Sequence, residues 1–321
     1  MEDLTAVPAL GPRQATTADG RAPADRPAPY LPPATHPIRA VVWALHLALP
    51  LLGLWLLLAN PALNIRWQHD LGHFWLILAV AGINVGLGTL VSQASAQRRD
   101  ARLFLVSLVF LSSAGFFLLH GLATPGVIMA RGSLGFDIGQ QVGLAIAAFF
   151  ALASAVPMGE GTAAAVLRIR EPLRVGLAVL LVAWGVFSLV PGLTPLSGVP
   201  PADGASLAGF ALVGIPLYTA AAVLLFLRHR KAPAPMLVSL ITAYALLAEA
   251  MLAGAYRHNW HLNWWEWHLL LTLAFVFVAY SAYLEFRREG SSAGLFDSVA
   301  LSATVRRVQE QYAEALEELV A

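Results

Sequence analysis

The sequence predicts an all-α protein, a polytopic membrane bundle of about eight transmembrane helices. Its 321 residues are 58% hydrophobic and 12% charged, with a mean hydropathy of +0.67, whereas soluble domains average about 25% charged residues. Apolar segments near the length of about 20 residues that crosses a bilayer recur along the chain. We place them at 40–59, 73–93, 103–122, 137–157, 174–192, 207–227, 235–256 and 266–285.

The segment before the first span, 1–37, is predicted to be a disordered cytoplasmic tail. It is rich in Pro, Ala, Thr and Arg, and such a composition buries too little apolar surface to fold. Because this polar tail precedes it, the first span does not fit a cleaved signal peptide, and we expect it to be retained as a membrane anchor. The eight-span membrane domain then covers 38–288, and a polar segment, 289–321, follows it.

The basic residues predict the orientation of the bundle, because short loops rich in Lys and Arg stay on the cytoplasmic side. With both termini inside, 17 of the 20 Lys and Arg residues fall in cytoplasmic segments, and the other three, Arg66, Arg131 and Arg257, fall outside. The sequence therefore predicts an N-in, C-in topology.

Charge and cysteine content exclude several classes of function. The formal net charge is +1 and the chain contains no Cys. A net charge this close to zero does not indicate a nucleic-acid-binding protein. The lack of thiols excludes disulfides, Cys-ligated zinc, iron–sulfur clusters and thiol nucleophiles. Any metal or proton chemistry must therefore use His, Asp, Glu or the backbone.

The histidines are distributed unevenly along the predicted topology. His69 and His73 form the motif HDLGH, whose i, i+4 spacing places both imidazoles on one helix face, and His120 ends the third span. Three more lie in the segment RHNWHLNWWEWH, at the start of the last span. The six near the outer face are His69, His73, His120, His258, His261 and His268.

This clustering predicts a metal site at the outer rim, because imidazole is a common ligand for transition metals such as zinc and copper. Asp70, Asp137 and Glu266 are the acidic residues that could complete it. Haem is disfavoured, because it normally takes paired axial ligands from facing helices, whereas these His lie near one rim. The alternative is that the His are interfacial side chains bonded to water, headgroups or carbonyls.

An acidic residue, Glu249, lies within the predicted seventh span. A charged side chain at the centre of a span costs about 2.5–3.5 kcal/mol on insertion scales. We therefore expect Glu249 to be protonated, paired or facing a cavity, either as a proton site or as a neutral carboxyl bonded to a neighbouring helix.

The C-terminal segment 289–321 predicts a cytoplasmic amphipathic helix that resembles a short coiled-coil seam. Its apolar positions recur at spacings of four and three residues. They are Leu301, Val305, Val308, Tyr312, Leu316 and Leu319. A seam would place a homodimer contact directly below the membrane, whereas the alternative is a helix that lies along the membrane surface or under the bundle.

Three segments, 100–128, 246–271 and 294–320, resemble the multi-span N-terminal sensor region of bacterial, especially actinobacterial, adenylate/guanylate cyclase-like signalling proteins. The runs LHGLATPG and HNWHLNWWEWH carry the resemblance most specifically. It implies a sensory module of the bacterial cytoplasmic membrane whose C-terminal helix feeds a cytoplasmic output domain, such as a cyclase or a kinase. The sequence stops at Ala321, where an output domain would begin, so cyclase activity is not implied for this chain.

Three functions follow as hypotheses. The first is a signal-input module that detects a ligand or metal at its extracytoplasmic rim and passes a conformational change through the C-terminal helix to an output protein. The second is a zinc-dependent membrane hydrolase built on His69, His73, Asp70 and Ser113. The third is a membrane cytochrome or transporter that uses Glu249. The chain contains no recognisable soluble catalytic motif, so we expect a non-enzymatic role.

Overall fold

The fold is given by a computed structural model that describes residues 37–130, 132–190, 207–231, 233–289 and 312. Within these residues the regular secondary structure is all helical, with short loops and two isolated bridges between the helices. Of the predicted tail 1–37, only Pro37 is described, and it begins the first helix. Of the predicted C-terminal segment 289–321, only Glu289, which ends the last described helix, and the seam position Tyr312 are described.

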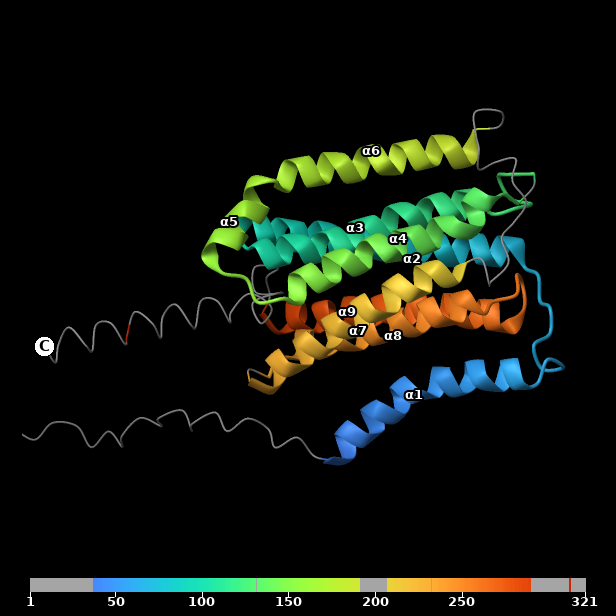
Figure 1. The fold of residues 1–321 in the computed structure, drawn as a ribbon, viewed down its shortest axis with the longest axis horizontal. Coiled ribbons are helices and arrows are strands. Elements are labelled where there is room, and N and C mark those ends of the chain that lie inside the picture. The colour runs from blue at the N-terminus through green and yellow to red at the C-terminus, as the bar shows by residue number, and fades with distance from the viewer. Residues whose placement is uncertain (1–36, 131, 191–206, 232, 290–311, 313–321) are drawn as a thin grey trace, which may run out of the picture. The chain divides into compact units, whose positions relative to one another are not determined.

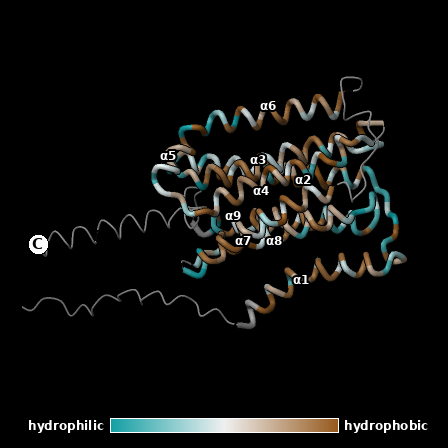
Figure 2. Tube along the Cα trace, in the orientation of Figure 1, coloured by the Kyte–Doolittle hydropathy of each residue, from teal (hydrophilic) through white to brown (hydrophobic). Residues whose placement is uncertain are grey.

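Eight of the described helices are long and apolar enough to cross a membrane, which confirms the predicted all-α polytopic bundle. Figure 1 shows most of these helices running back and forth along the horizontal axis of the view, and Figure 2 shows hydrophobic residues along most of their length. The long helices are α1 (Pro37–Ala59), α2 (Asp70–Arg98), α3 (Ala101–Leu122), α4 (Leu134–Ala155), α6 (Arg170–Leu189), α7 (Ala208–Lys231), α8 (Pro235–Ala255) and α9 (Leu262–Glu289).

Two elements differ from the predicted spans. Helix α2 has 29 residues and extends past the predicted span at both ends, because polar residues continue its helix beyond the apolar stretch. A short helix, α5 (Glu160–Arg168), lies in the predicted connection between two spans and has no buried residues. Its run of three Ala favours helix, whereas hydropathy alone identifies only membrane-length segments.

Helices α2 and α3 form a tight antiparallel pair. Arg99, which ends α2, takes the left-handed conformation with φ of 52°. Asp100 then caps α3, because its side chain accepts hydrogen bonds from the backbone N–H groups of Arg102 and Leu103. This turn brings the end of α3 back to the level at which α2 begins.

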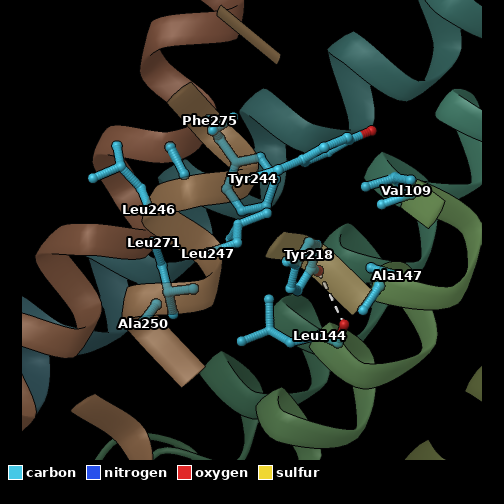
Figure 3. Packing of buried hydrophobic residues seen from close by; sticks show 14 of the residues in the cluster. Val109, Leu144, Ala147, Tyr218, Tyr244, Leu246, Leu247, Ala250, Leu271 and Phe275 are labelled. Atoms are coloured by element: carbon cyan, nitrogen blue, oxygen red, sulfur yellow. Dashed lines mark hydrogen bonds between the residues drawn. The ribbon is translucent and has the colours of Figure 1, made fainter. Parts of the chain in front are cut away.

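The core lies between α2, α3, α4, α7, α8 and α9. Helix α3 is the most enclosed span, with 78% of its apolar window buried, against 6% for α1. In the centre, the Tyr218 hydroxyl of α7 donates a hydrogen bond to the Leu144 carbonyl of α4, 3.0 Å away (Figure 3). Helix α1 instead exposes large apolar residues such as Leu45, Leu49 and Trp55, as expected for a helix that faces lipid.

Close packing between α3 and α4 depends on a glycine. A Cβ added at Gly143 would lie 2.4 Å from the Cβ of Phe116. We therefore expect Gly143→Ala to destabilise the protein by about 1–3 kcal/mol, the usual range for overpacking, measured by thermal unfolding in detergent. Gly86→Ala is the matched control, because no atom lies within 4 Å of the added Cβ. Equal stability of the two variants would contradict this account of the α3–α4 contact.

Candidate metal centre

Three of the six predicted histidines lie together, fully buried, inside one end of the bundle. They are His73 of α2, His120 of α3 and His268 of α9, none more than 1% exposed. The Nε2 atom of His73 lies 3.1 Å from Nε2 of His268 and 3.2 Å from Nε2 of His120. Three imidazoles from three spans therefore turn the same ring atom toward one point.

The opposite ring nitrogens are held by oxygen atoms. The Nδ1 atoms of His120 and His268 lie 2.7 Å from the carbonyl oxygens of Phe136 and Trp264, respectively. A carbonyl only accepts, so both Nδ1 atoms donate, and in the neutral rings both Nε2 atoms carry lone pairs. His73 Nδ1 lies 3.1 Å from the Thr124 hydroxyl, which can donate or accept.

This arrangement of lone pairs suits a cation better than a proton. If His73 carries its proton on Nε2, that N–H points toward two lone pairs and can satisfy only one of them fully. If it carries the proton on Nδ1, three lone pairs face one another at about van der Waals distance. An ion at the centre would satisfy all three Nε2 atoms, and the residues that hold the Nδ1 atoms would fix the ring orientations.

The spacing of the ring nitrogens agrees with metal coordination. Two nitrogens at about 2.05 Å from a tetrahedral ion are separated by about 3.3 Å, close to the 3.1 and 3.2 Å between His73 and its two partners, and the three ligand atoms all lie within 4.8 Å of one another. His73, His120 and His268 can therefore hold a metal ion, and they form the one such group of His and acidic residues found within the part of the chain that the structure describes.

Aromatic side chains enclose the three imidazoles. Phe136 stacks on His120 with ring centroids 4.3 Å apart and planes 9° apart. Trp264 packs against His268 at 4.0 Å and against His73 at 4.8 Å. Because these rings are buried as well, the centre lies in an apolar environment in which electrostatic interactions are strong.

A buried ion pair lies beside this enclosure. Arg257, in the loop after α8, contacts Asp137 of α4, with Nη2 3.5 Å from Oδ1 and both side chains 1% exposed. Arg257 also donates to Asn259, and its guanidinium carbon lies 5.1 Å from the centre of the Trp267 ring. The predicted acidic candidate Asp137 is thus paired with Arg257 and is not in the histidine group.

The loops before α2 and α9 are joined to each other over this end of the bundle. The backbone N–H of Trp67 donates to the Trp260 carbonyl at 2.7 Å, and the backbone N–H of Leu262 donates to the Ile65 carbonyl at 3.2 Å. Trp260 has a positive φ of 66°, an unfavourable conformation for a bulky residue that surrounding contacts must hold. Its ring lies 5.6 Å from that of His73, so the joined loops pack onto the centre.

The other predicted residues near α2 have different roles. His69 lies just before the helix and caps it, because its Nδ1 accepts a hydrogen bond from the Gly72 N–H at 2.9 Å. The i, i+4 spacing therefore does not bring His69 and His73 to one ion, since His69 is outside the helix. Asp70 begins α2 and accepts from the Gln68 amide at 3.2 Å.

His258 and His261 lie in the joined loops rather than in the centre. The His261 Nδ1 lies 2.7 Å from the Asn64 carbonyl, and the His258 ring is 5.7 Å from that of His261. Glu266, on α9, borders a cavity of about 780 Å³ between α1, α8 and α9. None of the three belongs to the group that can hold a metal.

Glu249, and the proposed hydrolase residues other than His73, are also separate from this group. Glu249 is half-buried in α8, and its Oε2 atom has no hydrogen-bond partner within the described residues. Ser113 donates to the Val109 carbonyl of its own helix at 2.8 Å. His69, His73, Asp70 and Ser113 are thus not assembled into one site.

Sequence reasoning missed the residues that orient the imidazoles. Thr124 follows His120 by four residues in LHGLATPG, so the sequence alone predicts that it lies near that end of α3. The sequence could not identify the Phe136 and Trp264 carbonyls as acceptors, because every residue carries a backbone carbonyl whatever its side chain. The pairing of Asp137 with Arg257 could not be predicted either, because the two residues are 120 positions apart in the sequence.

Comparison of the chain with protein-family models, with curated proteins and with solved structures gives no match. The resemblance to the sensor regions of cyclase-like proteins therefore stays a prediction, and the histidine centre is argued from its geometry alone.

The joined loops yield a prediction at Asn64, whose side-chain oxygen accepts from the Asn263 N–H at 3.0 Å. A hydrogen bond contributes about 1 kcal/mol, so Asn64→Ala should raise amide hydrogen exchange over 256–263 about fivefold in mass-spectrometric measurements. Asn60→Ala is the control, because the Asn60 amide donates only to Leu56 within its own turn. An unchanged exchange pattern in Asn64→Ala would show that this contact does not hold the loops together.

Proposed function

We propose that this chain is a membrane signal-input protein that binds a transition metal ion, zinc or copper, through His73, His120 and His268. The observation that carries the proposal is the convergence of three buried Nε2 atoms whose rings are oriented from behind by oxygen atoms. Intramembrane ionisable groups are functional by default, because their burial is costly. Imidazole is a ligand suited to both metals.

A haem is a poorer fit to the same residues. In a membrane cytochrome the porphyrin lies between two axial ligands. Here the Nε2 atom of His73 is only 3.1 and 3.2 Å from those of its two partners, and a porphyrin plane does not fit into that space. The geometry therefore favours a bare ion.

The centre joins helices that are well placed to pass on a signal. His268 lies near the start of α9, and the helix continues without a break to Glu289, which is about 30 Å further along at 1.5 Å per residue. Metal binding would fix His268 relative to His73 of α2 and His120 of α3, and a continuous helix carries a shift or a loss of motion at its start along its length. Small helix shifts of about 1–2 Å are a common form of switching.

The rest of the proposal extends the predicted topology. We propose that the histidine end of the bundle faces outward from a bacterial cytoplasmic membrane, and that the segment after α9 forms the predicted dimeric helix and contacts a cyclase-like or kinase-like output protein. The excess of Lys and Arg in the opposite loops supports this orientation.

The metal content of purified protein tests the centre directly. We expect elemental analysis of detergent-purified protein to find about one zinc or copper ion per chain. Because each imidazole supplies one ligand, His73→Ala, His120→Ala and His268→Ala should each weaken binding more than about tenfold. His258→Ala is the matched control, since it removes a nearby His outside the group. A parent protein without metal, or equal loss in His258→Ala, would overturn the proposal.

A second experiment tests transmission along α9 and uses the absence of native Cys. Spin labels are attached to Gln97→Cys and Arg287→Cys, two exposed positions near the ends of α2 and α9. We expect added metal to narrow the distribution of their pulsed-EPR distances and to shift its mean by up to about 2 Å, because the ion fixes α9 relative to α2 and α3.

Two controls accompany the distance measurement. The same label pair in a His268→Ala background should show no metal-dependent change. A Gln97→Cys and Lys231→Cys pair, which reports on α7 instead of α9, should move less than the α9 pair. If metal binds with the expected stoichiometry and the α9 distance stays fixed, the centre is structural and the signalling part of the proposal fails.

A further inference from the structure

We infer that the ion held by His73, His120 and His268 is monovalent copper, and that the buried Arg257–Asp137 pair enforces this choice of charge. The inference rests on the proposed metal-binding function and goes further by naming the ion and the residues that select it. It is carried by the charges at and around the centre, together with the number of ligands.

The three ligands bring no charge to the ion. In the neutral form that binds metal, each imidazole contributes a lone pair and nothing more. The group that can hold an ion contains no carboxylate. Zinc and divalent copper would therefore bring two positive charges into a fully buried, aromatic-lined site, whereas monovalent copper would bring one.

The nearest acidic residue does not compensate this charge. Asp137 directly follows Phe136, whose carbonyl oxygen lies 2.7 Å from His120 Nδ1. However, Asp137 is paired with Arg257 at 3.5 Å, and a second Arg257 contact reaches the Asp137 carbonyl oxygen at 3.3 Å. The pair is neutral as a whole, so the surroundings offer the ion no net negative charge.

Arg257 is connected to His268 through one aromatic ring. Its guanidinium carbon is 5.1 Å from the centre of the Trp267 ring, and that ring is 4.5 Å from the ring of His268. Because Asp137 offsets the Arg257 charge, only the residual field of the positive end of the pair acts on the ion through this contact, and that field disfavours a divalent ion twice as strongly as a monovalent one.

Burial increases the difference between the two charges. The solvation free energy lost when an ion leaves water grows with the square of its charge, and it is large at the low dielectric constant of a buried site. The ligands are at most 1% exposed, and Trp264 and Phe136 pack directly against them. A divalent ion therefore needs an anionic ligand or water that these apolar rings do not provide.

The number of ligands points in the same direction. Zinc in proteins is almost always four-coordinate, whereas monovalent copper is satisfied by fewer ligands and has no strong geometric demand. Three imidazoles supply a complete ligand set for monovalent copper. The same three leave zinc with a fourth position to fill.

The test compares monovalent copper with zinc in competition titrations against chromophoric chelators, under anaerobic reducing conditions. The parent protein should bind monovalent copper in preference to zinc, and copper-loaded protein should stay silent in EPR after exposure to air, because the site disfavours the divalent ion. A stoichiometric divalent-copper signal, or uptake of zinc in preference to copper from an equimolar mixture, would overturn the inference.

Charge variants then test the role of the pair. Arg257→Gln leaves the Asp137 carboxylate uncompensated, so zinc affinity should rise relative to monovalent copper by about tenfold or more. Asp137→Asn should shift the ratio in the opposite direction. The double variant restores neutrality and should return the ratio to that of the parent. Glu171→Gln, a change at an exposed position in the first turn of α6, is the control that should leave it unchanged.

The outcomes separate this inference from the proposed function. A parent protein that binds neither ion refutes both. One that binds zinc in preference to copper refutes only the inference and leaves a metal-binding protein. If Arg257→Gln unfolds, its thermal transition shows this, and the single variant Asp137→Asn and the EPR measurement on the parent still decide the outcome. An unchanged ratio in folded Arg257→Gln would mean that the pair does not select the charge.

Discussion

The convergence of three imidazoles inside an apolar bundle is the constraint on which the rest of the structure depends. Two of the rings are fixed by carbonyl acceptors and direct lone pairs at a third. Such an arrangement is stable only if α2, α3 and α9 are held at a fixed separation, because a buried polar group without a partner costs free energy. The tight turn at Arg99, the aromatic enclosure and the joined loops each serve to fix those three helices.

The same constraint explains how polar groups are partitioned within the membrane domain. Helices α1 and α6 contribute little to the core and are mainly apolar, so they can face lipid without polar contacts. The polar side chains of the histidine group, the ion pair and the joined loops lie instead at the end of the bundle where α2 and α9 begin. There, the ion pair of Asp137 and Arg257 is enclosed as tightly as the imidazoles, and each buried charge is matched by the other.

Hydropathy was sufficient to predict the eight spans, because membrane crossing imposes both length and composition on a helix. It could not separate His73 from His69, since the i, i+4 rule assumes that both residues are helical, whereas His69 is the residue that caps α2. It could indicate that six His lie at one end, but not that His258 and His261 belong to a loop contact. The backbone acceptors and the Asp137–Arg257 pair depend on tertiary contacts over long sequence separations, for which a single sequence contains no signal.

The distribution of the three ligands along the chain also has a consequence for biogenesis. His73 and His120 are synthesised early, in the second and third spans, whereas His268 belongs to the last one. Two imidazoles alone make an incomplete ligand set. The centre therefore cannot close until α9 has entered the membrane and docked against α2, whose His73 is 195 residues earlier in the chain than His268. Closure of the centre therefore requires the insertion of α9, and a product truncated before α9 would be left without it.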